Sequence, residues 1–195
     1  MIDMNRADHR LRILAGTLRG RMISASYTNT IRPTSSRVKE ALFNRLRHGF
    51  TDFGFRLEGA RVADLFAGTG ALGIEALSRG AVHATLVEQD PHALELIRSN
   101  ITKLQIEDKS TVLAADATNM PSPRLPVDLV LMDPPYGQQL TVPTLTNLAA
   151  KSWLTPGALV TAEGSGEESF KRLPGYELLD YRDYGRSRVF TFQAV

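Results

Sequence analysis

From residue 60 onward, short apolar segments alternate with helical ones, and this alternation restricts the possible folds more than any other feature. Segments such as ARVADLF (60–66) and VDLVLMD (127–133) have the length and near-continuous apolar character of buried parallel strands. Helix signals recur between such segments, as where Asp90 can cap a helix that Pro91 opens. Strand–helix units in series predict an α/β fold with a doubly wound, mostly parallel sheet.

The sheet is predicted to have seven strands. The expected strands are 60–66, 83–88, 110–116, 127–133, 157–163, 176–182 and 188–193. The last two lack a convincing helix between them, so we expect a closing hairpin that adds an antiparallel strand at one edge.

Residues 1–49 are predicted to form a separate N-terminal extension of the main domain, which covers 50–195. Residues 10–27 have the pattern of a β-hairpin, and residues 33–48 that of a helix capped by Thr34 or Ser35. The extension holds ten Lys or Arg against three Asp or Glu, a net charge of +7. The remainder carries −5, and the whole chain only +2. A basic arm on a mildly acidic body suggests a polyanionic partner, the alternative being an ordinary solvated surface.

Composition excludes several classes of protein. The 195 residues are 43% hydrophobic and include no cysteine, which rules out a disordered chain, disulfides, Cys-bound metal and thiol catalysis. No run of apolar residues is long enough to span a membrane, so we expect a cytoplasmic protein. The four histidines are scattered, and no metal is expected.

A glycine-rich turn follows the first strand of the main domain. The segment from Asp64 to Gly73 contains a G-x-G-x-x-G pattern, and Glu88 ends the next strand, 20 residues after Gly68. This spacing suits a dinucleotide as well as S-adenosylmethionine, and Glu88 could accept hydrogen bonds from ribose hydroxyls. Asp64 favours the second ligand, because its carboxylate would repel a pyrophosphate but attract an ammonium or sulfonium cation.

Two further acidic residues follow predicted strands. Asp116 could accept a hydrogen bond from an adenine amine, although a cap or loop role is the alternative. Asp133 begins the sequence Asp-Pro-Pro-Tyr, in which the prolines stop the strand and offer carbonyl oxygens but no N–H. The Asp133 carboxylate and the Pro134 carbonyl could together accept both hydrogens of an amino group and free its lone pair for attack. Tyr136 offers a ring on which a base could stack.

The motifs DLFAGTG and DPPY, with Glu88 and Asp116 between them, resemble those of class I S-adenosylmethionine-dependent methyltransferases that modify amino nitrogens. With RILAGTLRGRMI, IRPTSSRVKEALFNRL and YGRSRVFTF, the chain over about 10–193 resembles the RsmD-type family. That resemblance implies a Rossmann-like fold and methyl transfer to the N2 amine of a guanine in 16S ribosomal RNA. The base would leave its stack to reach the site.

The resemblance also implies roles for individual residues. It places catalysis at Asp133, Pro134, Pro135 and Tyr136. It places S-adenosylmethionine binding at Asp64, Phe66, Ala67, Gly68, Gly70, Glu88, Gln89, Asp116 and Ala117. It suggests RNA contacts at Arg19, Arg21, Arg32 and Arg37. The expected partner is ribosomal RNA, free or within an assembling small subunit, and we expect the protein to be a monomer.

Three alternatives stay open on the sequence. A DNA adenine or cytosine amino methyltransferase would use the DPPY loop equally well, and only the N-terminal segments disfavour it. An NAD-dependent oxidoreductase would fit the glycine turn but leaves DPPY unexplained. A non-catalytic RNA-binding module would use the basic arm alone.

Overall fold

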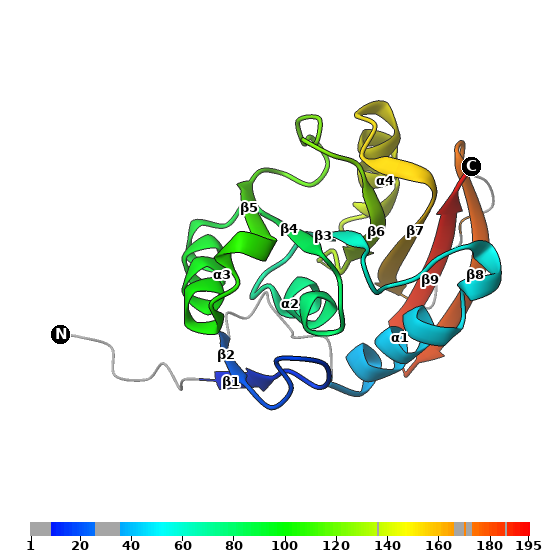
Figure 1. Ribbon diagram of the computed structural model, residues 1–195. Helices are drawn as coiled ribbons and strands as arrows, with labels where there is room; N and C mark the ends of the chain where they lie inside the picture. The colour runs from blue at the N-terminus through cyan, green and yellow to red at the C-terminus, as the bar shows by residue number, and fades with distance from the viewer. Residues whose placement is uncertain (1–8, 26–35, 136, 166–169, 171–172, 186) are drawn as a thin grey trace.

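The computed structural model describes residues 9–25, 36–135, 137–165, 170, 173–185 and 187–195 (Figure 1). The strands are β1 (His9–Arg12), β2 (Met22–Ala25), β3 (Arg61–Leu65), β4 (His83–Glu88), β5 (Ser110–Ala114), β6 (Val127–Met132), β7 (Leu154–Ser165), β8 (Tyr176–Tyr184) and β9 (Ser187–Ala194). The α-helices are α1 (Ser36–His48), α2 (Ala71–Ser78), α3 (Pro91–Leu104) and α4 (Thr141–Ala150). Two short 3₁₀ turns lie at Thr51–Phe53 and Glu107–Lys109. Among the described helices none is long and apolar enough to cross a membrane.

The central sheet confirms the predicted α/β fold and has the order β5-β4-β3-β6-β7-β9-β8. All neighbouring pairs from β5 to β7 are parallel, and β9 lies antiparallel between β7 and β8. The closing hairpin is therefore confirmed, but its antiparallel strand β9 lies inside the sheet, and β8 forms the edge. The chain leaves β3 toward β4 and later returns to the other side of β3 with β6. In α/β sheets a ligand binds beside the carboxyl ends of the strands at such a reversal, here between β3 and β6.

Each face of the sheet has its own apolar core, because successive strand residues point to opposite sides. On one face Val62, Leu86 and Leu129 pack in a single cluster that includes side chains of α1, α2, α3 and the β1–β2 hairpin. On the other face Ala63 and Val130 lie in a cluster with residues of α4 and the buried Trp153. Figure 1 shows α2 and α3 in front of the sheet and the hairpin beneath them.

The predicted hairpin and helix of the N-terminal extension are both present. β1 and β2 pair antiparallel, and α1 buries Val38, Leu42 and Leu46, as its apolar stripe predicts. The predicted caps, Thr34 and Ser35, lie outside the described residues. Lys39 of this helix is buried although it is charged, since its side chain is only 5% exposed.

The loop between β1 and β2 is fixed to α2 by backbone hydrogen bonds. The Thr17 N–H donates to the Ser78 carbonyl at 2.7 Å, and the Leu18 N–H donates to Ser78 Oγ at 2.9 Å. Gly16 makes this approach possible, since a Cβ there would lie 1.6 Å from the Ser78 carbonyl oxygen and its φ is +83°. The arm therefore has a defined position on the methyl-transfer domain predicted for 50–195.

Candidate active site

The turn after β3 is shaped by the buried carboxylate of Asp64. Its Oδ2 accepts the backbone N–H of Gly73, in the first turn of α2, at 2.8 Å. A Cβ at position 73 would lie only 3.1 Å from Asp64 Cβ, so glycine allows the helix to approach the strand closely. Within the turn, Phe66 has a φ of +59°, which is a rare and strained conformation for a bulky residue. Such strain, held by surrounding structure, is common at ligand-binding turns.

Glu88 holds the same turn from the neighbouring strand. Its Oε2 accepts the Gly68 N–H at 2.9 Å. Its Oε1 accepts the N–H groups of Gln89 at 2.8 Å and Asp90 at 2.9 Å. The half-buried carboxylate is thus fixed at the carboxyl end of β4, where the sequence placed a ribose acceptor. Ala67 lies between the two strands and donates its N–H to the Val87 carbonyl at 3.0 Å.

The loop after β5 is more open than the turn after β3. Asp116 is exposed, and its Oδ1 accepts both the N–H and the hydroxyl of Thr118 at 2.8 Å. This is the loop role considered as an alternative for Asp116, and its cofactor role stays a prediction. Ala117 is 3% exposed and packs in the core cluster on the α4 face.

Asp133 follows β6 directly and lies next to the glycine turn. The register pairs Met132 of β6 with Leu65 of β3, so Asp133 and Phe66 extend from adjacent strand ends. Asp133 is half-buried, Pro134 is buried and Pro135 is exposed. Tyr136 lies outside the described residues. The structure thus brings together the ends of β3, β4 and β6 with their carboxylates.

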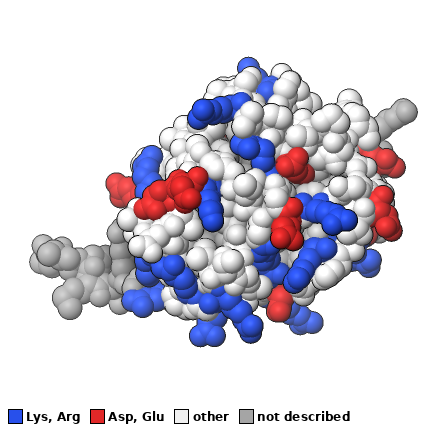
Figure 2. All heavy atoms as spheres, viewed as in Figure 1, with Lys and Arg blue, Asp and Glu red and all other residues white. Residues whose placement is uncertain are grey.

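The arginines of the N-terminal arm line one edge of the molecule. Figure 2 shows Lys and Arg gathered along the lower edge, where Figure 1 has β1, β2 and α1. The exposed arginines of these elements and their loop are Arg10, Arg12, Arg19, Arg21, Arg37 and Arg47. Arg21 also has a structural role, since its guanidinium donates to the Lys103 and Leu104 carbonyls at 2.7 and 3.1 Å, at the end of α3. Arg32 lies outside the described residues.

Comparison with known proteins identifies the family. Residues 11–193 match the family described as Conserved hypothetical protein 95. The chain belongs to this family. It is 34% identical over 164 residues to Ribosomal RNA small subunit methyltransferase D of Escherichia coli strain K12, covering 84% of this chain and 79% of that relative. Its namesake from Haemophilus influenzae is 30% identical over 188 residues, covering 94% of each. The solved structure of yhhF from Escherichia coli, a proposed methyltransferase, superposes with a TM-score of 0.80 at 30% identity, covering 95% of this chain and 98% of that one.

Membership in this family identifies the chain as a class I methyltransferase that uses S-adenosylmethionine as methyl donor. The acidic surroundings of the turn fit that cofactor, which carries a sulfonium cation. The pKa of Asp64 is raised to about 8, chiefly by burial; the Gly73 N–H acts to lower it, and the nearby charges of Asp133 and Glu88 act to raise it. A cation bound among these three carboxylates would relieve their mutual repulsion.

The raised pKa of Asp64 predicts how stability depends on pH without cofactor. The folded protein keeps a proton that the unfolded chain releases above a pKa of 3.8, so stability should fall as pH rises from about 4 to about 8. Titration of Asp64 lowers the free energy of unfolding by up to about 1.4 kcal/mol per pH unit in this range, and the effect ends above the pKa of the folded state. Asp64→Asn should remove this part of the slope, because its amide oxygen can still accept the Gly73 N–H. Urea unfolding at pH 5, 6.5 and 8 gives the free energy of unfolding of both proteins. Equal slopes of this free energy against pH would contradict the expectation.

Sequence reasoning missed several polar residues that join the N-terminal arm to the rest of the protein. Glu75 of α2, Lys39 of α1 and Asn100 of α3 are almost fully buried and link the arm to the methyltransferase domain. Glu75 had a detectable signal, because it is the one charged residue in the apolar helix sequence ALGIEAL. Asn100 had none, since an asparagine late in an amphipathic helix is ordinarily exposed.

Proposed function

We propose that this methyltransferase transfers the methyl group of S-adenosylmethionine to the exocyclic N2 amine of a guanine in 16S small-subunit ribosomal RNA. The adjacent placement of Asp133 and the Asp64–Gly70 turn at the ends of β6 and β3 carries the proposal. It sets an acceptor for an amino group beside the turn that suits a cationic methyl donor. The names of the curated relatives support ribosomal RNA of the small subunit as substrate.

An aromatic amine needs help to act as a nucleophile, because its lone pair is delocalised into the ring. The Asp133 carboxylate and the Pro134 carbonyl supply two acceptors for its hydrogens, which favours a pyramidal nitrogen. When bound, S-adenosylmethionine supplies a methyl group activated by the sulfonium charge. Methyl transfer would form the bond from the amine nitrogen to the methyl carbon as the bond from sulfur to that carbon breaks, and Asp133 would accept the proton that the amine then loses. In this proposal Tyr136 would stack on the flipped guanine, and Glu88, Gln89, Asp116 and Ala117 would contact the cofactor.

The basic arm is proposed to hold the RNA backbone. Its exposed arginines lie on the same face of the sheet as α2, whose first residue follows the glycine turn. Phosphate contacts of this kind supply affinity and orientation without reading sequence. Arg19 and Arg37 are the better candidates, because the Arg21 guanidinium is engaged with the carbonyls of α3.

Neutralising two arginines of the arm should weaken RNA binding in a salt-dependent way. We expect the double variant Arg19→Gln, Arg37→Gln to bind 16S ribosomal RNA about tenfold more weakly at moderate salt, with the slope of log K against log salt smaller by about 0.7–0.9 for each lost phosphate contact. Arg124→Gln is the control, since this exposed arginine lies in the loop before β6 and is not part of the arm. Filter binding across a salt series measures both, and equal losses in the two variants would count against the arm.

The proposed function is tested by mapping the methylated base. The protein is incubated with methyl-labelled S-adenosylmethionine and one of three substrates: naked 16S ribosomal RNA, isolated small subunits or double-stranded DNA. Label on the N2 of one guanine in 16S RNA is the expected result, and the first two substrates show whether assembly is required. Label in DNA, or on adenine or cytosine, would refute the assignment.

A further inference from the structure

The buried side chain of Asn100 joins the N-terminal arm to the glycine turn. Asn100 lies in α3 and is 0% exposed. Its Oδ1 accepts the N–H of Ser24 in β2 at 2.8 Å. Its Nδ2 donates to the Ser24 carbonyl at 3.0 Å and to the Thr69 carbonyl at 3.1 Å. One amide therefore bridges a strand of the arm and the residue between Gly68 and Gly70.

The chemistry of these three contacts requires a carboxamide. The Ser24 N–H needs an acceptor, whereas the Ser24 and Thr69 carbonyls need donors, and only an amide provides both on one short side chain. Burying an amide without partners would cost free energy that a leucine would not, so the bonds are what make it tolerable in this core. The Asn100 amide therefore fixes the position of β2 relative to the glycine turn, and its role is more than filling space in the core.

The two segments that Asn100 joins have different proposed tasks. The glycine turn is held on its other side by Glu88, which accepts the Gly68 N–H at 2.9 Å. Ser24 is paired in register with Arg10 of β1, an exposed arginine of the basic arm. A shift of the turn would thus be transmitted through the amide to the strand opposite Arg10, and a shift of the arm would be transmitted to the turn.

We infer that Asn100 is a positioning residue that couples cofactor binding at the glycine turn to RNA binding by the arm. The inference rests on the proposed function, which assigns the cofactor and RNA to these two places. Cofactor that shifts the turn moves the Thr69 carbonyl and, through Asn100, the strand that presents the arm. RNA then binds the arm in its shifted position, and by reciprocity RNA tightens the cofactor by the same factor.

The experiment measures this coupling factor. The dissociation constant of in vitro transcribed 16S ribosomal RNA is determined with and without saturating S-adenosylhomocysteine, whose own affinity is measured by calorimetry. We expect wild-type protein to bind RNA about fivefold to tenfold more tightly with the cofactor product present. In Asn100→Ala the factor should fall to near one. If the alanine variant fails to fold, Asn100→Asp replaces it. Aspartate keeps the size and the acceptor for the Ser24 N–H but has neither donor, so the coupling factor should again fall to near one.

Asn147→Ala is the matched control for loss of a buried amide. Asn147 lies in α4 on the other face of the sheet, is 9% exposed, and accepts the Met120 N–H at 3.2 Å. It should lower stability but keep the coupling factor. The inference is overturned if a folded Asn100 variant keeps the wild-type factor, if Asn147→Ala loses it equally, or if the wild type binds both ligands independently. Failure of the wild type to bind RNA or S-adenosylhomocysteine at all would instead refute the proposed function on which the inference rests.

Discussion

Asp133→Asn should lower kcat for methyl transfer by more than about 100-fold while leaving the affinity for S-adenosylhomocysteine within about twofold of wild type. The asparagine has the same shape but presents an NH2 group where the amine needs an acceptor, and it cannot take the proton. Asp133 extends from β6 beside the turn, and the variant leaves unchanged Asp64 and Glu88, which accept the Gly73 and Gly68 N–H groups. S-adenosylhomocysteine is the suitable probe, because it lacks the sulfonium charge that Asp133 would also attract.

Asp128→Asn is the control on the same strand. Asp128 lies near the amino end of β6, where its carboxylate accepts the Arg61 N–H at 2.9 Å and the Thr155 hydroxyl at 3.0 Å. This variant should keep its kcat, because it is at the opposite end of the sheet from the candidate site. Single-turnover assays with saturating RNA measure the chemical step in both. Full activity in Asp133→Asn would show that the amine is oriented by other groups.

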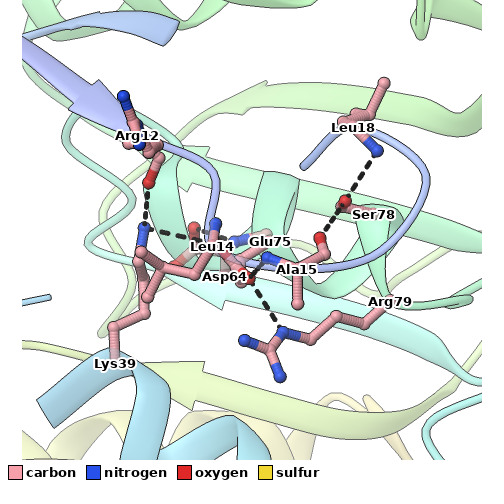
Figure 3. Close-up of polar contacts among 10 residues, drawn as sticks. Arg12, Leu14, Ala15, Leu18, Lys39, Asp64, Glu75, Ser78 and Arg79 are labelled. Carbon is pink, nitrogen blue, oxygen red and sulfur yellow. Dashed lines mark hydrogen bonds and ion pairs between the residues drawn. The ribbon is translucent and has the colours of Figure 1, made fainter. Parts of the chain in front are cut away.

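Glu75→Ala should destabilise the protein by about 3–5 kcal/mol, or roughly 10 °C in Tm. Figure 3 shows the Glu75 carboxylate surrounded by Leu14, Ala15, Lys39 and Arg79. It accepts the Leu14 N–H at 2.9 Å and the Ala15 N–H at 3.1 Å. Lys39 Nζ and Arg79 Nε lie 3.4 and 2.8 Å from its oxygens.

The cost of Glu75→Ala comes from the partners that it leaves behind. Burial already lowers the pKa of Lys39, and Glu75 offsets that effect. Without Glu75 the ammonium loses its counter-ion in a site that excludes water, and two backbone N–H groups lose their acceptor. Asp183→Ala removes a surface carboxylate from its pair with Arg188 and should leave the unfolding midpoint nearly unchanged. Urea denaturation monitored at Trp153 measures both variants, and similar midpoints would contradict the role of Glu75.

Much of the sheet could be predicted because its signals are local. The strand 83–88 matches β4, and Asp90 caps α3 by accepting the Ala93 N–H at 2.8 Å, as the Asp-Pro pair indicates. The glycine turn could also be predicted, because the whole motif lies in one short segment of the sequence. That segment includes Gly73, the glycine that lies close to the strand. Apolar period, caps and turns each report on a few neighbouring residues, and in these elements they agree with one another.

The links between the arm and the domain could not be predicted, because each depends on residues far apart in the sequence. Helical spacing within α1 does not show that Lys39 lies opposite Glu75 of α2. The Asn100 amide meets Ser24 across 76 positions and Thr69 across 31. Such pairings are set by how α1, α2, α3 and the hairpin pack, and a single sequence carries no record of that packing.

The position of β9 has a consequence for how the protein is made. This strand is the last described element to be synthesised, yet it lies inside the sheet between β7 and β8. During translation β7 must therefore present an open edge of unpaired backbone groups until residues 187–194 have emerged. We expect nascent chains that stall before this point to be held by chaperones or to aggregate, so that the sheet closes only after translation of this strand.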